Sequence, residues 1–369
     1  MVSEMPWSER AQPYRLAAVR VVPVFLLVVL PSVLVLGKII TSLDQGILAA
    51  DFHRAFWPAG RSVLRGDFAY DPLLLGGDPF VYPPLTAVLF APIAALPVAV
   101  ADLVYTAVGI LCVFLALRSF GVRDWRCYGM AFLWPGVVAS IQAGNLTLLL
   151  LGGVGLVWHF RARAVPLGLV VALLVSAKLF LWPLLLWLLL TRRYRAAAWG
   201  AFLLVALNAA GWVAIGAGSV SAYVHLLHRL TLSEAWDTYT LKAVAGKAGL
   251  PSWLGTVATW LAVAALLVVW RKVRRDDRST LALAVLIALV ASPIVWLHYL
   301  ALLLAPVGLV RQSFGWIWLV PMAAYVCPGK GSGTVAQAAV GVAVIAVVAA
   351  WTAVAARRDS RLPRVARPG

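Results

Sequence analysis

The sequence predicts an all-α, polytopic membrane protein. Apolar residues make up 63% of its 369 residues and charged residues only 12%, whereas about a quarter of the residues of a typical soluble domain are charged. The apolar residues also form runs as long as a spanning helix, which needs about 20 residues, and short arginine clusters separate these runs. We therefore expect one integral membrane domain over residues 1–369, built as a bundle of roughly 10–12 transmembrane or re-entrant helices.

The arginine clusters predict the orientation of the chain. Short cytoplasmic loops are enriched in arginine and lysine, so residues 1–18 and the basic tail at residues 357–369 are expected inside. The first span, residues 19–40, is then an anchor rather than a removable signal, and residues 41–83 and 217–252 form two large external loops. The net charge of +17 is assigned to cytoplasmic loops, and nucleic acid is not an expected partner.

The middle of the chain is expected to cross the membrane several times. Residues 85–96 are too short to cross and end at Pro97, whereas residues 99–117 can cross. Residues 125–141 are expected to run outward as one helix, turn at the polar step 142–145, and return over residues 146–160. Further membrane segments are expected over residues 196–216, 253–270, 314–326 and 335–356.

Two longer apolar stretches have arginine at both ends. Residues 164–191 and residues 279–310 are each too long for one span and too short for two. A broken pair of short helices keeps both ends of each stretch inside. The apex of the first pair is then near Lys178, and the second, interrupted at Ser292-Pro293, carries His298. Irregular backbone at this depth is tolerated where it is buried in protein or lines a cavity, so the two breaks predict a cavity.

The first external loop contains a charged, aromatic-rich stretch, residues 49–66, which is expected to form an amphipathic helix. It places the carboxylate of Asp51 just outside the bilayer. Arg54, Arg61 and Arg65 fall near one helical face if Pro58 does not kink the helix. A cationic face beside a carboxylate suits a phosphorylated lipid.

Two simpler interpretations of this stretch remain open. Asp51 can serve as an N-cap that satisfies backbone N–H groups. Alternatively, the helix lies in the membrane interface, with Phe52, Phe56 and Trp57 in lipid and the arginines on headgroups.

Lys178 and His298 are the ionisable side chains placed deepest in the membrane. A charge at membrane depth is costly and marks a functional site by default. The alternatives are a lysine that extends its ammonium group to the interface and a core histidine hydrogen-bonded to a carbonyl.

Other polar side chains are expected on the outer side. Gln142 and Asn145 can bind a ligand or cap helices. Trp236, Asp237 and Tyr239 form a candidate sugar-binding group, although an interfacial aromatic belt explains the tryptophan equally well. His225 and His228 are spaced for one helix face but have no third metal ligand, so no metal site is expected.

These features resemble the GT-C glycosyltransferases, specifically glycosyltransferase family 87, the polyprenol-phosphate-mannose-dependent α-mannosyltransferases of bacteria. The resemblance runs from the first span to the His298 region. The residues that carry it are Asp51-Phe52 with Leu64, Gly66 and Tyr70-Asp71-Pro72, Tyr82-Pro83-Pro84, Lys178 with Pro183, and Ser292-Pro293 with Trp296 and His298. Pro58 interrupts a helix that is usually smoother in this family, and residues 142–145 lack its usual Gly-Gln-x-Asn order.

The resemblance implies a GT-C-like helical bundle in the cytoplasmic membrane with its active site facing the exterior. It implies inverting transfer of a mannosyl residue from a polyprenyl-phosphate donor to a glycolipid or glycan acceptor. Asp51 is then the catalytic base, and Lys178 and His298 stabilise the departing phosphate. Arg54, Arg61 and Arg65 are expected to assist at the phosphate. The residues expected to contact the acceptor or the sugar are Tyr82, Gln142, Asn145, Trp236 and Asp237.

This mechanism calls for no metal or other cofactor, and the expected partners are the two lipid substrates and the membrane itself. Two other functions remain open. The same fold can use a polyprenyl-phosphate arabinose donor, since nothing in the sequence identifies the sugar. A lipid or polysaccharide transporter would also have broken helices and buried cations. A transporter, unlike a transferase, should tolerate the loss of the Asp51 carboxylate without losing a covalent product.

Overall fold

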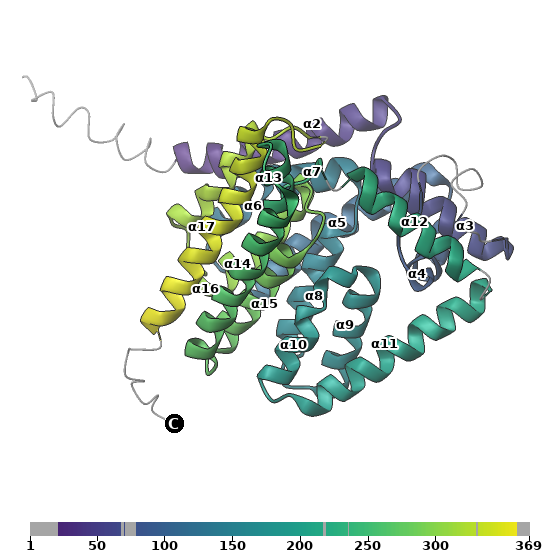
Figure 1. Ribbon diagram of the computed structural model, residues 1–369. Helices are drawn as coiled ribbons and strands as arrows, with labels where there is room; N and C mark the ends of the chain where they lie inside the picture. The colour runs from purple at the N-terminus through teal and green to yellow at the C-terminus, as the bar shows by residue number, and fades with distance from the viewer. Residues whose placement is uncertain are drawn as a thin grey trace, which may run out of the picture.

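The computed structural model describes residues 21–67, 70, 79–216, 219–234, 236–329 and 331–359, and all regular elements in this part of the chain are helices (Figure 1). The predicted all-α fold is confirmed. The expected cytoplasmic tail at residues 1–18, the Asp71-Pro72 part of the family pattern and most of the basic C-terminal tail lie outside the described residues.

The first half of the chain forms these helices, where η denotes a π- or 3₁₀-helix: η1 (Phe25–Val29), α2 (Leu30–Asp44), η2 (Phe52–Phe56), α3 (Trp57–Arg65), α4 (Pro84–Ala94), α5 (Val98–Phe120), α6 (Trp125–Leu133), α7 (Pro135–Ala143), α8 (Thr147–His159), α9 (Ala164–Ala177), η3 (Leu179–Leu181) and α10 (Pro183–Leu190). The second half forms α11 (Tyr194–Ile215), α12 (Ser219–Glu234), α13 (Leu241–Lys247), α14 (Ser252–Val273), α15 (Asp277–Ala291), η4 (Leu297–Leu303), α16 (Leu304–Val310), η5 (Trp316–Val326) and α17 (Val335–Asp359).

Five helices among the described residues are long and apolar enough to cross a membrane. They are Val21–Asp44, Val98–Phe120, Tyr194–Ile215, Ser252–Val273 and Val335–Arg357. The remaining apolar helices are shorter, and α7 and α8 form a bent pair with an angle of 116° between them. The long spans therefore enclose several broken or re-entrant segments, as the sequence predicts.

The two broken hairpins occur where the sequence predicts them. The first pair is α9 and α10, and between them Lys178 has an extended backbone with φ −147° and ψ 104°. The second break follows α15 at Ser292, and the chain continues as η4 and α16. At the ends of the two hairpins that lie away from the breaks, Arg193 donates a hydrogen bond of 2.6 Å to Asp277. This ion pair ties the two hairpins together.

The segment at residues 125–141 is not one helix, contrary to the sequence prediction. It divides into α6 and α7 at Trp134, whose φ of −65° and ψ of 129° are extended. The residue before a proline is disfavoured in the helical region because the proline ring meets its backbone, and Pro135 follows Trp134. Pro135 then begins α7, a position where its missing N–H is not needed.

The stretch at residues 49–66 does form a helical segment, and Pro58 does not end it. The segment runs without a gap from η2, a wider π-turn, into α3, and Pro58 is the second residue of α3. The missing N–H of Pro58 therefore falls where the π-turn passes into the α-helix. Phe52 and Phe56 are fully buried against the bundle. The interpretation that places these two rings in lipid is therefore wrong.

Candidate active site

The first element of the site is Lys178, which the break between α9 and η3 presents to two phenol rings. Its Nζ donates a hydrogen bond of 2.8 Å to the Tyr299 hydroxyl and lies 4.4 Å from the centre of the Tyr82 ring. No carboxylate among the described residues lies within ion-pair distance of Nζ. A cation held by neutral partners in an apolar surrounding favours binding of an anion.

His298 lies next to this cation because the second break brings η4 against the first. The centres of the His298 and Tyr299 rings are 4.9 Å apart, and Lys178 is close enough for its charge to act on the imidazole. The backbone carbonyl of His298 accepts a hydrogen bond of 3.3 Å from Ser140 on α7. Two breaks that are far apart in the sequence therefore place Lys178 and His298 together.

Asp51 lies in the helical stretch at residues 49–66. It is half-buried, and its side chain makes no capping hydrogen bond at the start of η2, so the N-cap interpretation is not supported. Its charge acts on the Tyr82 and Tyr105 hydroxyls. Burial is the main cause that raises the pKa of Tyr82 to about 12, Lys178 opposes this rise and Asp51 adds to it. The charges of Asp51 and Lys178 therefore both act on Tyr82, in opposite directions.

The turn between α7 and α8 supports the backbone next to Asp51. Gly144 has a φ of 61°, and a Cβ atom there would lie 2.4 Å from Ala49 Cα, so the two backbones are in close contact. Gln142 is half-buried and Asn145 is buried. The Asn145 carbonyl accepts a hydrogen bond of 2.8 Å from the Tyr105 hydroxyl.

The Asn145 side chain is only partly used. Its Oδ1 accepts a hydrogen bond of 2.9 Å from the backbone of Thr147, so the capping role considered for this residue is present in the structure. Its Nδ2 is buried without a partner among the described residues. An unused buried donor is expensive, and this one remains available to a ligand or a water molecule.

Arg54, Arg61 and Arg65 do not share one environment. Arg61 donates a hydrogen bond of 3.4 Å to the carbonyl of Ala94 at the end of α4 and lies over the Trp57 ring. Arg54 and Arg65 are exposed. The Trp57 indole also donates to this end of α4, at Leu96. Arg61 thus serves at least in part to hold α3 on α4.

Asp237 belongs to a separate cluster. Its Oδ1 accepts hydrogen bonds from the backbone and the hydroxyl of Ser332, at 2.8 and 3.1 Å, and from Lys247 at 3.2 Å. The Ser332 backbone N–H is the largest of the causes that hold the pKa of the Asp237 carboxyl below its usual value. Trp236 packs on Gly246, where a Cβ atom would lie 2.2 Å from its ring. These contacts fasten the segment around Asp237 to the chain before α17.

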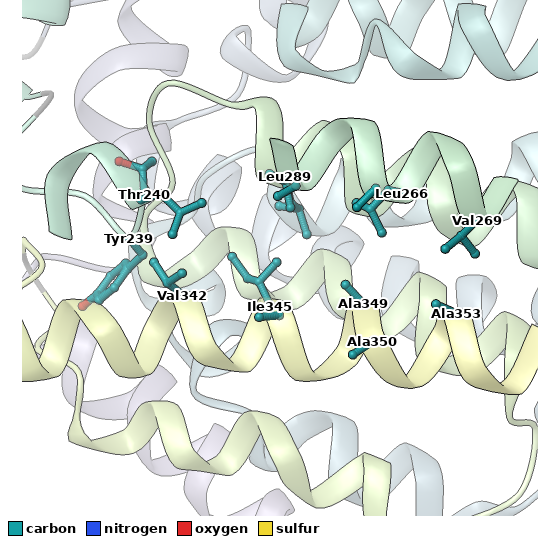
Figure 2. A pocket seen from close by; sticks show the side chains of 15 residues that line it. Tyr239, Thr240, Leu266, Val269, Leu289, Val342, Ile345, Ala349, Ala350 and Ala353 are labelled. Atoms are coloured by element: carbon teal, nitrogen blue, oxygen red, sulfur yellow. The ribbon is translucent and has the colours of Figure 1, made fainter. Parts of the chain in front are cut away.

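The structure also contains an apolar cavity of about 310 Å³ between α14, α15 and α17. Figure 2 shows Tyr239 and Thr240 at one end of it and Val269 and Ala353 at the other. The Tyr239 hydroxyl already donates to backbone carbonyls, and the Thr240 hydroxyl caps α13. Lys178 and His298 do not line this cavity, so it is not the cavity that the two breaks predict.

The sequence does not predict a role for Tyr299, His53 or Asp102 in this region. Tyr299 binds Lys178, and the His53 Nδ1 atom lies 2.8 Å from Asp102 Oδ2. Tyr299 directly follows His298 in the sequence, and this position beside a predicted site residue is a signal that could have indicated it. No sequence signal connects His53 with Asp102, because the two residues are 49 positions apart.

Residues 80–293, more than half of the chain, match glycosyltransferase family 87. The chain belongs to glycosyltransferase family 87. The part that matches the family includes Lys178, whereas Asp51 precedes it and His298 follows it. No solved structure matches the chain.

The named relatives that match the chain are only distantly similar to it in sequence. The chain is 27% identical, over 70% of its own length and 68% of the relative, to a polyprenol-phosphate-mannose-dependent alpha-(1-2)-phosphatidylinositol mannoside mannosyltransferase of Mycobacterium tuberculosis strain H37Rv. It is 25% identical, over 68% of its length, to a polyprenol-phosphate-mannose-dependent alpha-(1-2)-phosphatidylinositol pentamannoside mannosyltransferase of M. tuberculosis strain CDC 1551. It spans only 59% of that second relative.

Proposed function

We propose that this family 87 glycosyltransferase moves a mannosyl residue from a polyprenyl-phosphate donor to a glycolipid acceptor on the outer face of the cytoplasmic membrane. The observation that carries the proposal is Lys178, a cation bound to a phenol, with no carboxylate of the described residues at ion-pair distance. It lies beside His298, and its charge and that of Asp51 both act on Tyr82. Such a cation suits the phosphate of a lipid donor. The names of the relatives support mannose as the sugar and a phosphatidylinositol mannoside as the acceptor.

The proposed step is a single displacement at the anomeric carbon. The acceptor oxygen forms the new glycosidic bond while the bond from the anomeric carbon to the phosphate oxygen breaks. The electron pair of the broken bond remains on the phosphate, whose negative charge Lys178 stabilises. The acceptor proton passes to the Asp51 carboxylate. One carboxylate acting as a base, with no covalent intermediate, inverts the configuration of the sugar.

The direct test of this function is a transfer assay with the full-length protein in proteoliposomes. Labelled polyprenyl-phosphate mannose and polyprenyl-phosphate arabinose are supplied in parallel with a phosphatidylinositol mannoside acceptor. We expect labelled glycolipid from the mannose donor, with at least about tenfold preference over the arabinose donor. Product from the arabinose donor alone would assign the other sugar, and flux of unmodified lipid without any covalent product would assign a transporter.

The orientation is tested in the same membranes. A cysteine placed at position 51 is exposed to an impermeant thiol reagent in sealed right-side-out vesicles, and a cysteine at position 275 serves as the control. We expect position 51 to react and position 275 to stay protected, because the arginine clusters belong inside. The reverse pattern would put the site on the cytoplasmic face.

A further inference from the structure

A histidine–carboxylate pair joins the stretch at residues 49–66 to α5, and its histidine is two residues after Asp51. Asp102 is in the fifth position of α5 and only 4% exposed, and its Oδ2 lies 2.8 Å from His53 Nδ1. Its Oδ1 is buried and has no partner among the described residues. His53 is therefore the one side chain in the described part of the chain that hydrogen-bonds this carboxylate.

The pair explains how the Asp102 carboxylate can be buried despite the free-energy cost of burying a charge. A carboxylate buried near the end of a membrane helix costs free energy unless it is paired and hydrogen-bonded. The His53 side chain is 39% exposed, so the hydrogen bond is not needed to bury the histidine. The contact instead fixes the Nδ1 edge of the imidazole on α5 and leaves the rest of the ring near the surface.

The backbone that this contact holds is unfavourable by itself. Ala49 has a φ of 51°, and the chain then forms the π-turn of η2. Left-handed non-glycine residues persist where the surrounding structure determines them, and π-turns are frequent at functional sites. Asp51 lies between these two irregularities, so its direction depends on the contacts that surround them.

Two consecutive side chains provide that support. Phe52 stacks on Tyr105 of α5 with ring centres 4.3 Å apart, and His53 binds Asp102 of the same helix. Residues two positions apart on a helical turn point to nearly opposite sides. A small roll of the stretch about its axis would therefore break the His53–Asp102 contact and move Asp51 at the same time.

We propose that His53 and Asp102 form a positioning pair, whose hydrogen bond prevents this roll and keeps Asp51 directed at the acceptor hydroxyl. The expected effect of the pair on catalysis rests on the proposed function. Its effect on the position of Asp51 rests only on the geometry of η2 and α5. The pair acts through the position of its N–H donor and acceptor, so a neutral amide in the same place can substitute for either member.

The test compares variants that keep or remove this hydrogen bond. At position 53, an asparagine places its amide N–H where the histidine has Nδ1, and a glutamine places its amide N–H where the histidine has Nε2. A phenylalanine at this position has no N–H donor in its side chain. We expect His53→Phe, His53→Gln and Asp102→Leu to lower kcat at least about tenfold with little change in the KM for the donor. His53→Asn and Asp102→Asn should retain most of the wild-type kcat.

The control is His159→Phe, a substitution of an exposed histidine at the far end of α8, which should leave kcat unchanged. The thermal midpoint of each variant shows whether it folds. The proposal is overturned if His53→Asn loses as much kcat as His53→Gln, or if none of the five substitutions changes kcat. Because Asn and Gln are both polar amides, their comparison does not depend on the folding of His53→Phe.

A second readout does not require any transferase activity. Asp51→Cys is made in a chain from which Cys112, Cys127 and Cys327 have been removed, and its rate of modification by an impermeant thiol reagent is measured. Adding His53→Gln should change that rate at least about threefold, whereas adding His53→Asn should not. Equal rates would refute the pair even if the enzyme is active. A changed rate in a protein that transfers no mannose would refute the proposed function and keep the pair.

Discussion

The Tyr299 hydroxyl is the nearest hydrogen-bond partner of Lys178, at 2.8 Å, and Tyr82 offers the cation its ring face at 4.4 Å. Both partners are neutral, so they orient the ammonium group without cancelling its charge. A hydrogen bond to a charged group contributes about 1.5–3 kcal/mol. Tyr299 therefore positions the group on which the proposed phosphate stabilisation depends.

Removing this hydroxyl should weaken the site. We expect Tyr299→Phe to lower kcat/KM for the polyprenyl-phosphate donor by roughly 10- to 100-fold, which corresponds to the loss of one hydrogen bond to a charged group. The steady-state kinetics of Tyr325→Phe provide the matched control, because the Tyr325 hydroxyl donates to the carbonyl of Leu133 and not to Lys178. Equal effects of the two substitutions would show that Lys178 does not depend on Tyr299.

The sequence indicates side chains whose burial in the membrane costs free energy. It does not indicate side chains whose role depends on a contact with a distant segment. Lys178 and His298 could be predicted because ionisable side chains are rare at membrane depth. Tyr299 could not be separated from the other tyrosines, and the His53–Asp102 contact joins two elements whose packing the sequence does not reveal. The hydrogen bonds that join Asp237 to Ser332 could not be predicted either, because the two residues are 95 positions apart.

Helix ends in this protein follow proline and glycine closely. The break before Pro135 and the left-handed Gly144 divide and bend the chain between α6 and α8. The polar step at residues 142–145 predicts the turn at Gly144. The break at Trp134 could not be predicted, because an apolar run on both sides of a single proline looks continuous. The two hairpins were predictable because arginine at both ends of one apolar stretch leaves few alternatives.

Gly144 links the bent pair to the stretch at residues 49–66, and this link can be tested. Gly144→Ala adds a Cβ atom 2.4 Å from Ala49 Cα, so the backbone next to Asp51 must move. We expect the transfer rate to fall at least about tenfold, since small displacements of catalytic groups are costly.

The control for Gly144→Ala is Gly249→Ala, assayed in the same way. Gly249 has a similar positive φ of 73°, and no atom lies within 4 Å of the position of its added Cβ. Both substitutions share the backbone cost of alanine in the left-handed region, which is about 1 kcal/mol. A similar loss of transfer in both would show that the contact with Ala49 has no role.

For the whole molecule, composition was sufficient to predict the fold class, and the distribution of arginine was sufficient to predict the breaks. Neither could predict that the two breaks meet, because that depends on how α7, α9 and η4 pack. The sequence also could not show that the large apolar cavity lies between α14, α15 and α17. Long-range packing in a helical membrane bundle depends on close backbone contacts, which leave little periodic signal in the sequence.

The central claim is that Asp51 accepts the acceptor proton while Lys178 stabilises the leaving phosphate. Asp51→Asn keeps the size of the side chain and removes the base, and Asp67→Asn is the matched control on an exposed aspartate just after α3. Mannosyl transfer from labelled polyprenyl-phosphate mannose is measured for both variants, together with donor binding. We expect Asp51→Asn to lose at least about 10²-fold in kcat while it still binds the donor, and Asp67→Asn to behave as wild type. Transfer by Asp51→Asn at close to the wild-type rate would contradict this account.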